Sequence, residues 1–383
     1  MTLVEESPYL TLWWRGETVL PIEDLAAWTH GQRLLPLLAW RAARQDWALP
    51  APLIEAARRV RYRTEASQVL AAQQLQSLSE IARRSEIPIV VVKGAVVAQT
   101  YPEPWMRPYA DVDLLIPQSA VPALLDAVRE AGYRVMADML GDRGWHLPPL
   151  QPGDGAGLKL EIHTSLAHER GQDMFAYEAW AGGLRPWPAF PGLWLPDPVD
   201  HALYLIHHAA VHHGFTIGGL PLADLKFWTL CWDAVQWDQL AAKAEACDLQ
   251  RAVGIFLALA AWFWREPWPP EVTARFPLPT PGVLATAQRI VTGELAQKMP
   301  FIWRDLSERN LRGVLAYANL VLFGDPALRQ GLPLKEKVLF YLRRPFRLLR
   351  NHGPTLWRLV RGDRRTRNAW YTQQELQEWM HGD

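Results

Sequence analysis

The chain has 383 residues, of which 49% are apolar and 21% are charged, and its 40 basic and 40 acidic side chains cancel to a formal net charge of zero. This length suits two or three domains with cores of their own. A neutral chain lacks the overall positive field that attracts nucleic acid. Two cysteines, Cys231 and Cys247, cannot build a disulfide framework, which favours a reducing, cytoplasmic location.

Neither a secretory signal nor a membrane span is expected. The first ten residues lack a basic segment followed by an apolar one. The longest apolar run, from Ala252 to Trp264, is shorter than the roughly 20 residues that a bilayer requires. The 20 tryptophans are expected to lie mostly in the core, because tryptophan is large and highly buried on average.

The first zone, residues 1–86, is predicted to be an N-terminal helical region. Its clearest helix covers residues 66–86, where good helix formers surround apolar residues at helical spacing.

The second zone, residues 87–196, is predicted to alternate strands and helices. Residues 87–92 are short, apolar and β-branched, which is typical of a buried strand. Residues 110–116 indicate a second strand, and residues 119–131 indicate a helix that begins at Ser119 and ends at Gly132. The other strands expected here are residues 133–137 and 158–163.

Helical patterns return after this zone. Residues 197–334 are predicted to form a helical domain and residues 335–383 a basic helical tail. The helices expected in the domain cover residues 199–213, 221–232, 237–247, 251–264 and 282–297.

Two carboxylates stand out in the second strand. Asp111 and Asp113 are two residues apart, so their side chains project from the same face, about 7 Å apart along the backbone. Val112 and Leu114 then face the core. Two neighbouring carboxylates repel each other unless they share cations, and Mg²⁺ favours one or two carboxylates together with phosphate oxygens and water. An Asp-x-Asp pair also arises by chance in a chain of this length, so its strand context matters.

A third carboxylate is expected from residues 158–163. Apolar residues alternate there with Lys159, Glu161 and His163. If this strand lies beside that of Asp111 in the matching register, Glu161 joins the two aspartates. In such a trio, two groups anchor metal ions and the third orients or deprotonates an attacking hydroxyl group.

The segment from Ile89 to Ile116 resembles the nucleotidyltransferase superfamily, which has the DNA-polymerase-β-like fold. More narrowly, it is similar to bacterial proteins with the pattern KG…YP…R…DxDLL, often encoded near genes for polysaccharide or peptide biosynthesis. The resemblance is looser out to about residue 230. The matching positions, in chain order, are Lys93-Gly94, Tyr101-Pro102, Arg107 and Asp111 to Leu115.

This resemblance implies an α+β fold, with a small mixed-sheet nucleotidyltransferase core flanked by N-terminal helices and a helical C-terminal domain. It implies that Asp111 and Asp113 bind Mg²⁺ and are catalytic, that Glu161 is the third catalytic carboxylate, and that Lys93 and Gly94 contact the nucleotide. The chain departs from the usual pattern at Ala95, where members carry a small polar residue. It also has a longer gap between Gly94 and Asp111.

Five further polar residues are candidates. Arg107 could clamp a phosphate or steady the aspartates, or form an ordinary salt bridge. His163 could contact substrate or orient a carboxylate. His208 and His212 share a helix face as zinc ligands can, but substrate contacts or structural roles fit better because no Glu or Cys accompanies them. Asp224 could accept a hydrogen bond from these histidines or cap the next helix.

The tail is strongly basic. Between Lys335 and Asn368 the chain has 11 Lys or Arg and 2 Asp or Glu, interleaved with apolar residues. Such a segment could lie on an anionic membrane surface or bind nucleic acid. The alternative is a solvated helix that packs its apolar side on the body of the protein.

Together these patterns predict a Mg²⁺-dependent enzyme that moves a nucleoside monophosphate from a nucleoside triphosphate, such as ATP, to an acceptor. The acceptor stays open between a sugar, a small molecule, a peptide and an RNA end. The main alternative is a binding protein on a catalytically degenerate nucleotidyltransferase scaffold. A metal-dependent hydrolase that uses the histidine cluster is a third interpretation.

Overall fold

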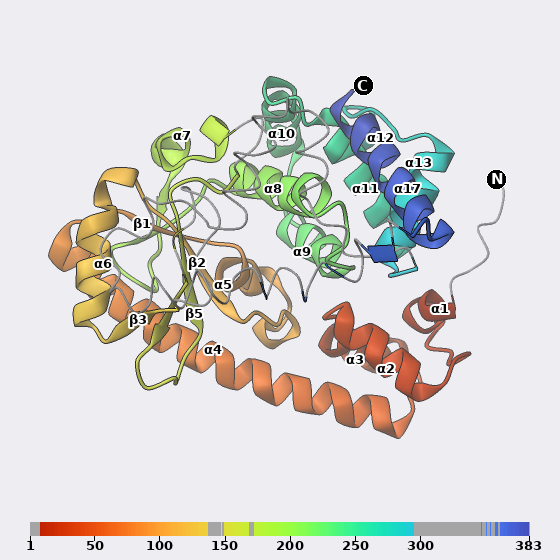
Figure 1. Cartoon of the computed structure of the whole chain (residues 1–383), viewed down its shortest axis with the longest axis horizontal. Coiled ribbons are helices and arrows are strands. Elements are labelled where there is room, and N and C mark those ends of the chain that lie inside the picture. Colours follow the sequence, from red (N-terminus) through yellow and green to blue (C-terminus); the bar gives the residue numbers. More distant parts are fainter. Residues whose placement is uncertain are drawn as a thin grey trace.

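The computed structural model describes residues 8–136, 149–167, 172–294 and 361–382, with a few single positions outside these ranges. Figure 1 shows a twisted sheet at one end of the molecule and a group of helices at the other, joined along one edge by a single long helix, α4 (Ala51–Ser85). The α+β fold predicted from the sequence is confirmed.

Within the described residues, seven strands form one mixed sheet in the order β3-β4-β5-β2-β1-β7-β6. Strand β1 is antiparallel to β2 and parallel to β7, whereas β2 is parallel to β5. The strands predicted around residues 87–92, 110–116, 133–137 and 158–163 are present. The seven strands are β1 (Ile89–Val92), β2 (Asp111–Leu115), β3 (Tyr133–Val135), β4 (Leu150–Pro152), β5 (Lys159–His163), β6 (Arg185–Pro186) and β7 (Leu193–Leu195).

One face of the sheet is covered by α4 and by α6 (Val121–Glu130), which lie on its outer side in Figure 1. Val112, Leu114 and Leu160 on this face are fully buried against apolar residues of the two helices. This is the burial that the alternation of apolar residues along β2 and β5 predicts. The opposite face therefore carries the polar residues of the same strands.

The helical part of the molecule draws on both ends of the chain. The indole N–H groups of Trp13 and Trp14 both donate to the carbonyl oxygen of Phe263, at 3.1 and 2.9 Å. The N-terminal helices thus complete the core of the later ones. The helices involved are α1 (Pro8–Arg15), α2 (Ile22–Gly31), α3 (Leu35–Gln45), α8 (Pro198–His207), α9 (Leu220–Trp228), α10 (Ala234–Ala246), α11 (Gln250–Trp264), α12 (Pro270–Thr273) and α13 (Pro281–Val291).

Most of the basic tail predicted after residue 335 lies outside the described residues. Its final helix, α17 (Arg364–His381), packs on α13 and α11. Leu376 and Met380 are buried there, and the Arg251 guanidinium donates to the Trp379 carbonyl oxygen at 3.1 Å. Over the ranges that the structure covers, every helix is too short or too polar to cross a membrane.

Candidate active site

The register of β2 and β5 brings the predicted carboxylates together. Asp113 pairs with Glu161 across the two parallel strands, and Asp111 pairs with Lys159. Because side chains two residues apart share a face, Asp111, Asp113 and Glu161 all lie on the side of the sheet away from α4 and α6. The matching register predicted for these strands is therefore present.

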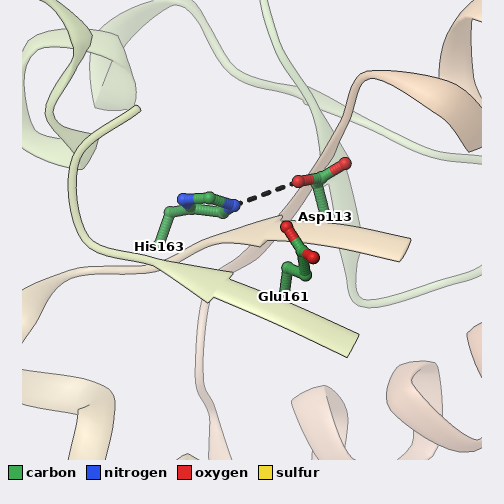
Figure 2. A group of neighbouring side chains, drawn as sticks. All are labelled: Asp113, Glu161 and His163. Carbon is green, nitrogen blue, oxygen red and sulfur yellow. Dashed lines mark hydrogen bonds and ion pairs between the residues drawn. The ribbon is translucent and has the colours of Figure 1, made fainter. Parts of the chain in front are cut away.

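Asp113 and Glu161, in the middle of their strands, and His163, at the end of β5, form a tight group, as Figure 2 shows. Each offers one ligand atom within 4.8 Å of the others, and among the described residues this is the acid and histidine group close enough to share a metal ion. His163 Nε2 lies 3.0 Å from Asp113 Oδ1, and both side chains are about 97% buried. Asp111 stands outside this group.

The two aspartates have opposite electrostatic environments. Burial first, then repulsion from Asp113 and Glu161, raises the pKa of Asp111 to about 6. Burial acts in the same direction on Asp113, but the Lys93 ammonium 2.8 Å from its Oδ1 and the hydrogen bond with His163 hold its pKa well below the ordinary value. Lys93 is thus the cation that balances part of a crowded negative site.

The turn between β1 and the short helix α5 (Gly94–Val97) places Lys93. Gly94 is required there by crowding, because a Cβ on it would lie 2.8 Å from Tyr109 Cβ and 2.9 Å from Arg107 Nη1. Ala95 is 2% exposed and packs into the sheet core. The side chain at this position points into the apolar core, which explains why it is apolar in this chain.

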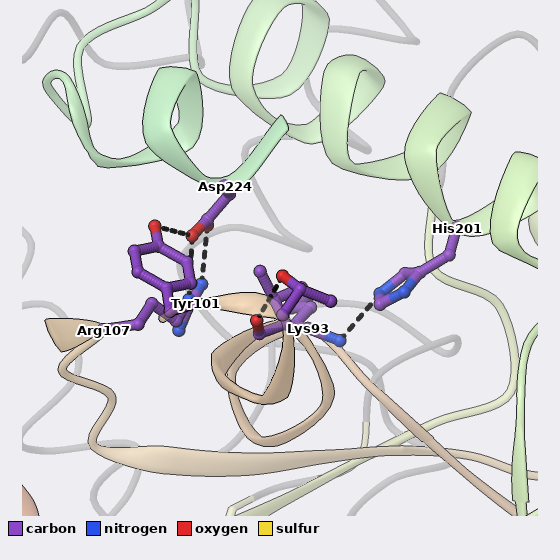
Figure 3. A network of polar contacts seen from close by, with 7 residues as sticks. Lys93, Tyr101, Arg107, His201 and Asp224 are labelled. Carbon is purple, nitrogen blue, oxygen red and sulfur yellow. Dashed lines mark hydrogen bonds and ion pairs between the residues drawn. The ribbon is translucent and has the colours of Figure 1, made fainter. Parts of the chain in front are cut away.

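Arg107 and Asp224 form a buried ion pair between this region and helix α9 (Figure 3). The guanidinium donates through Nε to Asp224 Oδ1 at 3.0 Å and through Nη2 to Oδ2 at 2.8 Å. The Tyr101 hydroxyl donates to the same Oδ1 at 2.6 Å. Among the described residues, Asp224 is therefore paired with Arg107 and Tyr101, and not with a histidine or the start of a helix as considered from the sequence.

Helix α8 lies next to Lys93, the residue that pairs with Asp113. Its start is fixed by Pro198 and by the Asp197 side chain, which accepts hydrogen bonds from two backbone N–H groups. His201, Tyr204 and His208 follow at spacings of three and four residues, so they share one face. The Lys93 ammonium nitrogen lies 5.8 Å from the centroid of the Tyr204 ring, and the Lys93 backbone N–H donates to His201 Nε2 at 3.0 Å.

His201 and Tyr204 were not identified from the sequence. The Asp197-Pro198 pair marks the start of a helix, and the three-residue spacing of His201 and Tyr204 then indicates that they share a polar face of it. The sequence gives no indication that it meets the turn at Lys93, which is more than 100 residues earlier.

The predicted histidine cluster lies next to this face, on a π-helical turn (His208–His212). The His208 and His212 rings stack with centroids 5.5 Å apart, and His213 lies 4.5 Å from His208. Burial, and then the charge of Lys93, keeps the pKa of His208 well below its ordinary value. In the described part of the chain these histidines do not form a metal-ligand group, so the zinc interpretation gains no support.

The structure thus places two aspartates on a central strand, a glutamate on its parallel neighbour and a lysine at the preceding strand–helix turn. Residues 20–265 match the model of a family described as uncharacterised nucleotidyltransferase. This match spans more than half of the chain, and the protein belongs to that family.

The chain was also compared with curated proteins and with solved structures. The search among curated proteins finds no match. Among solved structures, the chain is similar to the antibiotic-resistance factor ANT(2'')-Ia, described in solution with substrate-regulated conformation dynamics. The identity is 16% and the TM-score 0.34, over 45% of this chain and 92% of that one.

Proposed function

We propose that the protein transfers a nucleoside monophosphate from a nucleoside triphosphate to an acceptor hydroxyl or phosphate, with Mg²⁺ as its cofactor. The observation that carries this proposal is the β2–β5 register, which sets Glu161 beside Asp113 on the face that also bears Asp111. Family membership supports the reaction class. The register supports a group of carboxylates that could bind the metal ion for this reaction.

The residues fit Mg²⁺. Carboxylate oxygens are its preferred protein ligands. The pKa of Asp111 is raised first by burial and then by repulsion from Asp113 and Glu161, and a bound cation would relieve this repulsion. We assign Asp111 and Asp113 as the metal-binding residues, with Glu161 adjacent. When bound, the ion would polarise the α-phosphate and neutralise charge that develops on the leaving group.

The chain's own residues would then position the reactants. The acceptor oxygen forms a bond to the α-phosphorus while the bond from that phosphorus to the bridging oxygen breaks, and pyrophosphate leaves with the electron pair. Glu161 takes the proton of the acceptor hydroxyl. The Lys93 ammonium donates hydrogen bonds to phosphate oxygens, while His163 holds the Asp113 carboxylate in place.

The other predicted residues have proposed roles around this centre. Arg107, which covers Gly94, supports the turn where the nucleotide would bind. His208 and His212 follow Tyr204 and are proposed to line the acceptor side. Asp224 is proposed to fix helix α9 through its ion pair with Arg107. Contact of the basic tail with an anionic membrane stays a prediction that sedimentation with vesicles would test.

The test is to incubate the protein with each α-labelled nucleoside triphosphate, Mg²⁺ and a cell extract. We expect label in a product that chelation of the metal prevents, and pyrophosphate in equal amount. Asp111→Asn and Asp113→Asn should each lower transfer by a factor of about 10³ or more. Asp238→Asn, a change at a largely exposed residue, should leave it unchanged. Transfer of the γ-phosphate instead would contradict the proposal.

One observation favours the second candidate, a binding protein on a degenerate scaffold. Gly94 is closely covered by Tyr109 and Arg107, and Ala95 offers no hydroxyl group at the position where the resemblance implies a small polar residue. Calorimetric titration with ATP separates the candidates. A chain that binds no nucleotide, with or without Mg²⁺, supports the scaffold interpretation.

A further inference from the structure

The backbone at Lys93 has an unusual conformation. Its φ of 55° and ψ of −126° lie in a region that L-amino acids rarely adopt and that glycine adopts readily. Glycine occupies the next position instead, where crowding requires it. The chain therefore keeps a long charged side chain at a position whose backbone would be more stable as glycine, and such strain is found mainly at functional sites.

One hydrogen bond holds this turn from outside the sheet, the bond from Lys93 N–H to His201 Nε2 at 3.0 Å (Figure 3). His201 is fully buried. Its ring packs edge-on against Trp228, with centroids 4.7 Å apart, and the Trp228 indole donates to the Pro198 carbonyl oxygen at 2.8 Å. The start of α8, the imidazole ring and the Lys93 turn are therefore held together.

The protonation of His201 suits this role. Burial, and then the charge of Arg107, lowers its pKa to about 3, so the ring is neutral and Nε2 accepts while Nδ1 carries the hydrogen. This Nδ1 is buried and has no hydrogen-bond partner among the described residues. A buried donor without a partner costs stability, and a leucine of similar size would avoid that cost.

We infer that His201 is a positioning residue, which acts by holding the strained Lys93 turn so that the Lys93 ammonium meets Asp113 and the phosphates of the nucleotide. The part concerning phosphates rests on the proposed function. The hydrogen bond joins two groups that each lower stability: the strained backbone of Lys93 and the imidazole of His201, whose Nδ1 has no partner among the described residues. A residue that only filled space at this position would require neither of them.

Three variants separate positioning from packing. His201→Gln keeps an acceptor oxygen that can reach the Lys93 N–H, whereas His201→Leu fills a similar volume without an acceptor. Leu203→Ala removes an equally buried apolar side chain from the same helix and serves as the control for general destabilisation.

The first measurement does not depend on activity. An amine-acylating reagent is applied to each variant, and mass spectrometry compares modification of Lys93 with that of the more exposed Lys243. In the wild type, Lys93 is protected by its burial and its ion pair. We expect His201→Leu to raise the ratio of Lys93 to Lys243 modification about fivefold or more. His201→Gln and Leu203→Ala should stay near the wild-type value.

An unchanged ratio in His201→Leu, or an equal rise in the Leu and Gln variants, would overturn the inference. The second measurement is nucleotidyl transfer. His201→Leu should lower kcat at least about tenfold with a smaller change in KM, and His201→Gln should retain most of kcat. If the wild type transfers no label, the proposed function fails, while the acylation ratio still decides the role of His201.

Discussion

At the level of single residues, the site contains two aspartates with opposite environments. The charged form of one is stabilised by its neighbours, and the charged form of the other is destabilised. Asp113 is held by Lys93 and His163. Asp111 has its pKa raised by burial and by its acidic neighbours. Residues arranged to bind a substrate or a metal ion often lower the stability of the unliganded protein. The two aspartates should therefore respond to mutation in opposite directions.

We predict that Asp111→Asn stabilises the metal-free protein at pH 7. A carboxyl with a folded pKa near 6 and an ordinary unfolded value near 4 binds more protons in the folded state between these values. Stability is therefore lost as the pH rises through that window. The penalty at pH 7 is about 2 kcal/mol after partial exposure to water is allowed for. Urea unfolding in the presence of a chelator, at pH 4 and pH 7, measures it.

The matched control is Asp113→Asn. The depressed pKa of Asp113 contributes stability that is present above the ordinary carboxyl pKa and lost as the pH falls. Its removal also leaves the Lys93 ammonium without its buried partner, so this variant should be less stable than the wild type at pH 7. A loss of stability in Asp111→Asn at pH 7 would contradict the destabilising effect of burial and repulsion on the charged Asp111 carboxylate.

At the level of strands and helices, the part of the site that could be predicted is the part that lies on two strands. The alternation of apolar and polar residues in 110–116 and 158–163 fixes which side chains share a face, and a buried face then restricts the register. Glu161 beside Asp113 follows from this. The grouping of Asp113 with His163 rather than with Asp111 does not, because it depends on the side-chain conformations of these residues.

The contacts made by helices could not be predicted in this way. Helical spacing shows that His201 and Tyr204 share a face of α8, but the loops before α8 decide that this face meets Lys93. The same holds for Asp224, whose partner Arg107 lies 117 residues earlier. Strands β6 and β7 are two and three residues long, too short to carry a recognisable alternation.

The buried Arg107–Asp224 ion pair connects the loop after α5 with helix α9, and its contribution to stability can be predicted. Both side chains are at least 90% buried, so removing one charge leaves the other without compensation. We expect Asp224→Ala to lower the free energy of unfolding by about 3–5 kcal/mol. Replacing both residues, as Arg107→Met with Asp224→Leu, should restore much of this loss. Urea unfolding of the single and double variants measures the coupling.

The surface pair of Arg275 and Asp238 is the control for that experiment. Its Nε–Oδ1 distance of 2.7 Å is as short, but the Asp238 side chain is 65% exposed. Asp238→Ala should cost no more than about 1 kcal/mol, because exposed ion pairs contribute little. Equal losses at the two sites would contradict a dependence of the ion-pair contribution on burial.

At the level of the whole molecule, the N-terminal helices and the later helices share one hydrophobic core. Residues of α1, α2 and α3 are buried together with residues of α8 to α13, while the second half of α4 covers the sheet. Helix α4 thus contributes to both cores. The N-terminal region defined from the sequence as residues 1–86 therefore packs on partners that come much later in the chain.

This shared core predicts that a change in the short helix α1 weakens helices more than 200 residues away. Trp13 is fully buried, donates to the Phe263 carbonyl oxygen and packs its ring 5.0 Å from that of Phe263. Trp13→Ala should lower the free energy of unfolding by about 3–5 kcal/mol. Hydrogen exchange should then show faster exchange of α11 amides as well as those of α1. Val19→Ala, at a residue that is 56% exposed, should change neither. If α11 kept its protection in Trp13→Ala, the N-terminal helices would be a separately stable unit.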